Sequence, residues 1–149
     1  GTSEVLSNWE ELKRKEKGQS TNTDALSAVA RSLPALWRAE KVQKKARKAG
    51  FDWPDVSGAL DKVSEETEEL RQAVAEGSNI EEELGDLLFA AVNVSRFVHA
   101  DPEEALTRAT DKFIDRFRQV EALAKAEGRA MEDMTLAELD ALWERAKGR

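Results

Sequence analysis

Two pairs of carboxylates are the residues of this sequence whose types and spacing are best suited to chemistry. Glu66 and Glu69 form one pair, Glu83 and Asp86 form the other, and the members of each pair are three positions apart. This spacing brings two side chains onto one face of a helix. If the turn at 77–79 lets two helices pack antiparallel, four carboxylates converge, and such a cluster repels itself unless a cation lies within it. The pattern therefore predicts a cation site.

The surroundings of Asp86 strengthen this prediction. The segment 84–98 is apolar nearly all round a helix, which predicts burial on most sides or at a subunit interface, and Asn93 lies two turns beyond Asp86 on the same side. An ionised carboxylate is costly there unless it is paired or metal-bound. We therefore expect Asp86 either to bind a cation or to pair with a lysine or arginine of a neighbouring helix. The pair Glu66 and Glu69, taken alone, is more typical of a solvated helix face.

Lys112 and Arg116 supply the opposite charge, four positions apart on a later predicted helix. They could pair with the acids directly, or hold a polyphosphate that also coordinates the metal. Sites made only of oxygen ligands suit Mg²⁺ or Mn²⁺, and a bound cation lowers the pKa of a coordinated water. The residues thus predict metal-dependent phosphoryl or nucleotidyl hydrolysis, and they leave open which phosphorus is attacked.

The composition narrows the class of protein. The chain has 149 residues, enough for one domain with a sizeable core, and a net charge of −7, which argues against general binding to nucleic acid or anionic membranes. It contains no cysteine and a single histidine, so thiolate sites are excluded, and His-based zinc sites and di-iron sites with Glu-x-x-His pairs are disfavoured. No segment has the pattern of a signal peptide or a membrane span, and we expect a cytoplasmic protein.

Hydrophobic periodicity and helix punctuation predict an all-α protein with a four-helix-bundle-type core and flanking N- and C-terminal helices. The expected helices cover residues 4–17, 34–49, 55–76, 80–99, 102–127 and 136–147. The β-branched residues 92–94 fall inside one of these helical patterns, which argues against a strand.

Three finer expectations follow from the same punctuation. Asn79 should be the N-cap of its helix with Glu82 completing a capping box, and Thr135 with Glu138 should form another. Residues 1–32 should form an N-terminal helix and linker, with 1–3 a cloning remnant and 19–24 a mobile polar stretch, and residues 33–149 the domain.

With these residues assembled, the chain resembles the MazG family of nucleoside triphosphate pyrophosphohydrolases, within the all-α NTP pyrophosphatase group. The resemblance covers about residues 33–147. Its most specific part is the ordered pair Glu-x-x-Glu and Glu-x-x-Asp. Further segments carry it at consistent spacing: 33–36, 39–43, 50–53, 62–66, 81–89, 93–96 and the Lys-Phe-x-x-Arg-Phe of 112–117.

The resemblance implies an activity and a set of site residues. It implies that Glu66, Glu69, Glu83 and Asp86 bind Mg²⁺, with Mn²⁺ as a substitute, and that a triphosphate is hydrolysed between its α and β phosphates, with Glu66 or Glu69 as the base. It further implies homodimers and substrate-binding roles for six residues: Lys62, Glu82, Asn93, Lys112, Arg116 and Trp143. Trp143 would hold the nucleotide base, although a core anchor is an equal alternative.

Other functions stay open at this point. The chain most resembles the C-terminal domain of a two-domain member, so we expect it to be a piece of a longer protein. Within enzymes, a narrower dUTP/dCTP or phosphoribosyl-ATP pyrophosphohydrolase is the nearest alternative. Outside enzymes, the chain could form a non-catalytic helical dimer that acts as a regulatory scaffold, with its acids held in salt bridges or used to regulate a partner.

Overall fold

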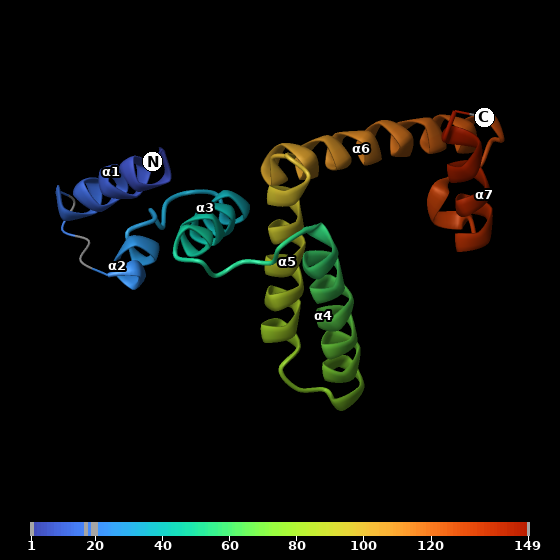
Figure 1. Ribbon diagram of the computed structural model, residues 1–149. Helices are drawn as coiled ribbons and strands as arrows, with labels where there is room; N and C mark the ends of the chain where they lie inside the picture. Colours follow the sequence, from blue (N-terminus) through green and yellow to red (C-terminus); the bar gives the residue numbers. More distant parts are fainter. Residues whose placement is uncertain (1, 17, 19–20, 149) are drawn as a thin grey trace. The chain divides into compact units, whose positions relative to one another are not determined.

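The computed structural model describes residues 2–16, 18 and 21–148 (Figure 1). Some predicted features fall on the remaining residues and so lie outside the described part: Gly1 of the cloning remnant, Lys17 at the end of the first predicted helix, Gln19 and Ser20 of the linker, and the final Arg149.

The described residues form helices and no strands, which confirms the all-α prediction, and residues 92–94 lie within a helix. In chain order the elements are α1 (Thr2–Glu16), α2 (Asn22–Ser27), α3 (Ala35–Lys48), α4 (Val56–Glu76), α5 (Ile80–Phe97), α6 (Pro102–Ala126), the 3₁₀ turn η1 (Met131–Asp133) and α7 (Leu136–Ala146). None of these helices is both long and apolar enough to cross a membrane.

The chain divides into two compact units, and the boundary falls between Glu103 and Glu104 near the start of α6. In the first unit, α4 and α5 form a helical hairpin, α3 packs against α5, and α2 packs against α3 (Figure 1). This hairpin is the element that positions the predicted acids.

The turn of the hairpin is tight and corrects one prediction. Gly77 ends α4 in the left-handed region at φ 71°, and Asn79 precedes α5 in the same region at φ 58°. With its backbone in this conformation, Asn79 makes no side-chain cap bond, and its carbonyl instead accepts from the Glu83 N–H at 3.0 Å. The predicted capping box between Asn79 and Glu82 is therefore wrong.

A short helix lies where part of the linker was predicted. The Thr21 hydroxyl accepts a hydrogen bond from the Asp24 N–H at 3.0 Å, and the Asp24 carboxylate accepts from the Thr21 N–H at 3.1 Å. This capping box starts α2. The expectation of a linker over residues 19–24 is thus wrong from position 22 onward.

The second unit is held by a small apolar core between α6 and α7. Val120, Ala124, Leu142 and Ala146 are buried there, and Trp143 is among the residues packed against them. The predicted capping box of Thr135 and Glu138 is confirmed, with both reciprocal hydrogen bonds at 3.1 Å.

Candidate functional site

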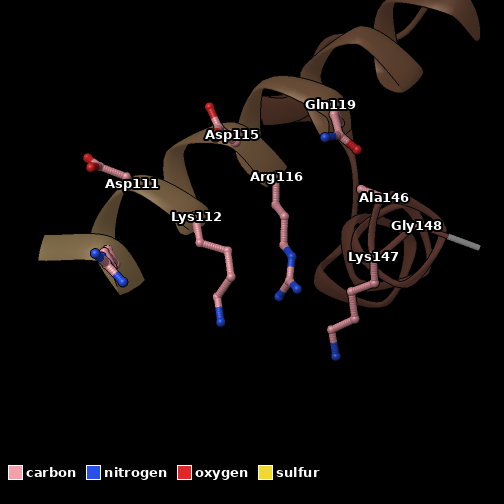
Figure 2. Close-up of a pocket in the computed structure, with 9 residues that line it drawn as sticks. Asp111, Lys112, Asp115, Arg116, Gln119, Ala146, Lys147 and Gly148 are labelled. Carbon is pink, nitrogen blue, oxygen red and sulfur yellow. The ribbon is translucent and has the colours of Figure 1, made fainter. Parts of the chain in front are cut away.

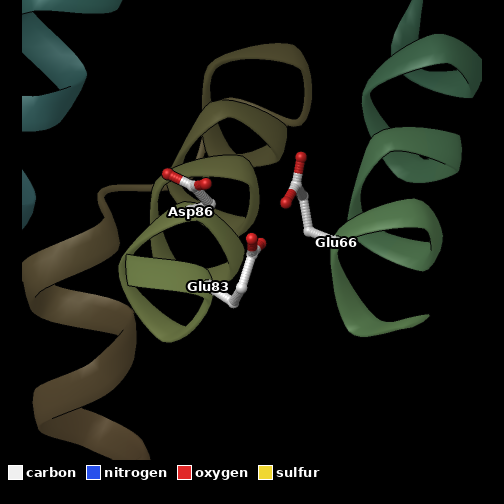
Figure 3. Close-up of side chains that lie close together, drawn as sticks. All are labelled: Glu66, Glu83 and Asp86. Atoms are coloured by element: carbon white, nitrogen blue, oxygen red, sulfur yellow. The ribbon is translucent and has the colours of Figure 1, made fainter. Parts of the chain in front are cut away.

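Three of the four predicted metal-binding acids meet between the two helices of the hairpin. Glu66 projects from α4, Glu83 and Asp86 project from α5, and the three side chains lie close together (Figure 3). Each offers an oxygen, and these oxygens all lie within 4.8 Å of one another. Such a set of oxygen donors suits a hard divalent cation.

Burial within the cluster differs from the expectation. Glu66 is buried, with 8% of its surface exposed, whereas Asp86 is exposed. Within one chain the expected burial of this helix on most sides is wrong, because the apolar neighbours of Asp86, Leu84 and Leu88, are themselves about half exposed, at 45% and 52%. The alternative of burial at a subunit interface stays a prediction. Nor does Asp86 pair with any lysine or arginine among the described residues. The buried charge that needs a partner is therefore that of Glu66.

The electrostatics of Glu83 reflect the crowding of acids. Burial, followed by repulsion from Glu69, Asp86, Glu66 and Glu82 in that order, raises the pKa of its carboxyl above the ordinary 4.5. Glu69 is exposed and lies outside the group of three, yet its charge is close enough to act on Glu83. The fourth predicted acid is thus electrostatically coupled to the cluster.

Lys62 neutralises part of this charge. Its ammonium lies 3.1 Å from the Glu66 carboxylate, one turn along α4, and 3.3 Å from Glu65. Hydrogen bonds to these two carboxylates raise the pKa of Lys62. Lys62, predicted as a substrate ligand, is therefore already at the edge of the cluster.

A cleft of about 790 Å³ opens beside the acids within the first unit. Four predicted site residues line it together: Lys62, Glu66, Asp86 and Asn93. The rest of its wall comes from α2, α3, the 50–53 turn and α5, and includes Gln43, Phe51, Asp52, Trp53, Phe89 and Arg96. Glu82 does not line this cleft and lies exposed in the first turn of α5.

One wall of the cleft is fixed by a buried arginine. The Arg96 side chain is 5% exposed, and its Nη2 donates to Asp52 Oδ1 at 2.7 Å. Its Nε also donates to Asn93 Oδ1 at 2.8 Å. Because Arg96 occupies the Asn93 oxygen, the Nδ2 hydrogens are the part of Asn93 suited to bind an oxygen-bearing ligand.

The predicted cations lie in the second unit. Lys112 and Arg116 line an open cleft of about 480 Å³ together with Arg108 and Lys147. Figure 2 shows the side chains of Lys112, Arg116 and Lys147 extending in one direction, with those of Asp111 and Asp115 turned away. This arrangement suits an anion.

Trp143 lies next to this cationic group. Its ring is half-buried, 5.2 Å from that of Phe113 between centroids, and the Arg116 guanidinium lies 5.8 Å above it. Packing of this kind is compatible with both roles predicted for Trp143, base holder and core anchor.

Several residues of these clefts received no role from the sequence. Arg108 continues the spacing of four set by Lys112 and Arg116, a signal that would have found it. Gln43 and Asp52 stand in segments that carry the resemblance, but only long-range contacts, to Phe89 and Arg96, bring them to the cleft.

Comparison with known proteins identifies a domain family and relatives whose sequences are similar to this chain. Residues 54–121 match the MazG nucleotide pyrophosphohydrolase domain. The chain is 43% identical over 150 residues to a nucleoside triphosphate pyrophosphohydrolase of Escherichia coli (strain K12), covering 98% of this chain and 57% of that protein. It is 42% identical over 140 residues to the nucleoside triphosphate pyrophosphohydrolase/pyrophosphatase MazG of Thermotoga maritima, covering 94% of this chain and 54% of that protein.

A third relative is the uncharacterized protein YabN of Bacillus subtilis (strain 168), 49% identical over 147 residues, which are 97% of this chain and 30% of that protein. The chain thus spans a little over half the length of the first two relatives. Over residues 54–121, which include all four predicted metal-binding acids, the chain is similar to the MazG nucleotide pyrophosphohydrolase domain.

Proposed function

We propose that this chain hydrolyses nucleoside triphosphates between the α and β phosphates, in a Mg²⁺-dependent reaction that yields a nucleoside monophosphate and pyrophosphate. The observation that carries the proposal is the convergence of Glu66, Glu83 and Asp86 within 4.8 Å beside a cleft large enough for a nucleotide. Two relatives named nucleoside triphosphate pyrophosphohydrolase support it.

The acids fit the metal that the proposal requires. Glu66, Glu83 and Asp86 would hold Mg²⁺ or its substitute Mn²⁺, with Glu69 beside them, because carboxylate oxygens are the donors that these ions prefer. When bound, the cation would neutralise phosphate charge and acidify a water molecule.

The remaining steps use the chain's own side chains. Glu66 or Glu69 accepts the proton of the water that attacks the α-phosphorus, and both alternatives stay in the proposal. The Lys62 ammonium lies 3.1 Å from the Glu66 carboxylate and offsets part of the charge of the cluster. Lys112 and Arg116 stabilise the departing pyrophosphate, Asn93 and Glu82 contact the substrate, and Trp143 holds the base or anchors α7.

Removal of two acids tests the proposal. Glu83→Ala and Asp86→Ala should each lower kcat at least a hundredfold while the helical circular dichroism spectrum is preserved, because both side chains are partly or fully exposed. Glu68→Ala, on the exposed side of α4, is the matched control and should retain activity. Full activity in either cluster variant would contradict the metal assignment, and orthophosphate as the released product would contradict the bond assignment.

Two narrower questions have their own assays. A panel of canonical, deoxy and modified triphosphates, with phosphoribosyl-ATP, separates a general enzyme from a dUTP/dCTP or phosphoribosyl-ATP pyrophosphohydrolase. Calorimetric titration with Mg²⁺ and a non-hydrolysable triphosphate separates an enzyme from a scaffold, since a scaffold with internally paired acids would bind neither.

We also propose that the chain works as a homodimer. The support is apolar surface on α5, where Leu84 and Leu88 are 45% and 52% exposed. Equivalence to the C-terminal domain of a two-domain protein and a cytoplasmic location remain proposals drawn from the resemblance and from the cysteine-free composition.

A further inference from the structure

A row of cations lies on one side of α6 in the second unit. Arg108, Lys112 and Arg116 follow one another at intervals of four residues, so each step along the row advances about 6 Å along the helix. Lys147 of α7 lines the same cleft of about 480 Å³. Figure 2 shows the side chains of Lys112, Arg116 and Lys147 extending in one direction. Four cationic side chains therefore meet at one open cleft.

The acids of this cleft do not cancel its charge. Asp115 pairs with Arg118 at 3.0 Å, and Figure 2 shows Asp111 and Asp115 directed away from the lysines. Within the part of the chain that the structure describes, Lys112 and Arg116 form no ion pair. Their charges are thus available to a ligand.

The two arginines of the row suit phosphate groups. Arg116 is half-buried, and its guanidinium lies 5.8 Å above the ring of Trp143, which packs on the core of this unit. A guanidinium ordered in this way can donate two parallel hydrogen bonds to one phosphate group. Arg108 pairs with Glu104, but these side chains are 78% and 58% exposed, and ion pairs at such positions are weak. A polyanion can therefore replace Glu104 as the partner of Arg108.

The row is longer than pyrophosphate needs. Two phosphorus atoms joined by one bridging oxygen are closer together than two neighbouring positions of the row, so pyrophosphate engages two neighbouring cations. Arg108 and Arg116 are about 12 Å apart along the helix, and simultaneous contact with both requires a longer chain of phosphate groups. The net charge of −7 disfavours general adsorption of a polyanion, so a ligand of this kind would be held by the local row.

We infer that this cationic cleft is a metal-independent binding site for linear inorganic oligophosphates longer than pyrophosphate. Lys112 and Arg116 hold two phosphate groups, and Arg108 contacts the groups beyond them. This binding requires neither the acids of the first unit nor catalysis. Its regulatory consequence rests on the proposed function: a bound oligophosphate occupies the two cations that the departing pyrophosphate would use, and so inhibits hydrolysis.

Calorimetric titration of the whole chain in EDTA tests this site. Tetrapolyphosphate should bind about tenfold more tightly than pyrophosphate, because its additional phosphate groups gain charge-assisted hydrogen bonds. In Arg108→Gln this difference should fall to about twofold or less, while the affinity for pyrophosphate should change by less than about twofold. Equal affinities of the two anions for wild type, or a tenfold difference that survives in Arg108→Gln, would overturn the inference.

Arg118→Gln on the same helix is the matched control. The side chains of Arg118 and Arg108 are similarly exposed, at 70% and 78%, and each pairs with an acid of α6. Arg118 does not line the cleft. Arg118→Gln should therefore keep the tenfold difference between the two anions. An equal loss in the two variants would show that only the total charge matters, and would overturn the inference.

A single-stranded oligonucleotide is another polyanion that a row of cations could hold. It should bind more weakly than tetrapolyphosphate, because its charges are spread over a longer chain, and tighter binding would overturn the assignment of the ligand. If the wild type releases no pyrophosphate from any triphosphate, the proposed function fails, and the titration in EDTA still decides the site. If the wild type hydrolyses triphosphates but does not distinguish tetrapolyphosphate from pyrophosphate, the inference fails alone.

Discussion

At the scale of single residues, the acid cluster is a source of repulsion that the fold tolerates. Glu66 is buried and relies on Lys62 at 3.1 Å, while Glu83 has a raised pKa because of burial and its acidic neighbours. A raised carboxyl pKa means that the folded state disfavours the ionised form, so ionised Glu83 lowers stability. A divalent cation would reverse this effect.

The metal-free protein should therefore gain stability from Glu83→Gln. Since the pKa of Glu83 is raised, its penalty appears as the pH rises from the ordinary 4.5 through the folded-state pKa, and it is complete at pH 8. In EDTA, Glu83→Gln should have a higher Tm than wild type at pH 8, and the difference should narrow below pH 4.5. Mg²⁺ at a hundredfold excess over Kd should stabilise wild type by about 2.7 kcal/mol and so raise its Tm, and it should not raise the Tm of the variant.

Calorimetric melting curves of wild type and Glu83→Gln, recorded in EDTA and in Mg²⁺, measure these differences in Tm. Glu68→Gln is the control and should respond to Mg²⁺ like wild type. An equal Mg²⁺ shift in wild type and Glu83→Gln would show that Glu83 is not a ligand.

The pKa of Asp52 is shifted in the opposite direction to that of Glu83. Its hydrogen bond from Arg96 outweighs burial and holds the pKa of this carboxyl below the ordinary 3.8. Stability from this pair is therefore complete above pH 3.8 and is lost as the pH falls toward the folded-state pKa. Asp52→Asn should cost about 2 kcal/mol at pH 7, measured by urea denaturation, because a charge-assisted hydrogen bond is lost. The exposed Asp61→Asn should cost under about 0.5 kcal/mol.

The Asp52→Asn deficit should begin to shrink as the pH falls below 3.8, because the unfolded wild type then binds a proton that the paired native carboxylate still resists. A deficit that stays constant down to pH 3 would mean that Asp52 acts through packing rather than charge.

At the scale of elements, the capped N-terminus of α7 contributes to the stability of the second unit. The Thr135 hydroxyl caps α7, and Glu138 both completes the box and pairs with Arg129, which lowers the pKa of Glu138 to about 2. Because α7 has only 11 residues, its stability depends on this cap and on the small core it shares with α6.

Thr135→Ala should accordingly destabilise the protein by about 1 kcal/mol, the usual cost of losing a side-chain N-cap. Thr110→Ala is the matched control, because that hydroxyl only bonds back to the Leu106 carbonyl within α6 and should cost little. Urea denaturation followed by circular dichroism compares them. Equal effects of the two substitutions would show that the cap contributes nothing specific.

The helices and the acid pairs were predictable because both depend on local spacing. Glu66, Glu83 and Asp86 meet through a period of 3.6 and one short turn. The conformation of Asn79 was not predictable, since Asn is a good N-cap by type and only the closed turn places it at φ 58°. Gln43 was also missed as a residue of the cleft wall: one glutamine on an amphipathic helix has no pattern, and its place there depends on a hydrogen bond to Phe89, 46 residues away.

At the scale of the whole molecule, the proposed dimer depends on the apolar side of α5. At roughly 100° per residue, Leu84 and Leu88 lie close together on this helix and well away from Glu83 and Asp86. A face of this kind can associate with a second copy without disturbing the acids.

Leu84→Glu combined with Leu88→Glu should therefore convert a dimer to a monomer in sedimentation and light scattering, because a charge is costly to bury in such an interface. Leu136→Glu, at a more exposed apolar position of α7, is the control and should not change the mass. A monomeric wild type, or a double variant that remains dimeric, would contradict an interface at this face.

The hairpin that carries the acids should also affect the rate at which the chain folds. Glu66 and Asp86 are only 20 residues apart in the chain, and contacts of such short separation tend to form early in folding. The repulsion between these acids is then already present in the transition state. A divalent cation bound there should act mainly by accelerating refolding, with a smaller effect on the rate of unfolding. The acid cluster of the hairpin would in this way also set how quickly the chain reaches its fold.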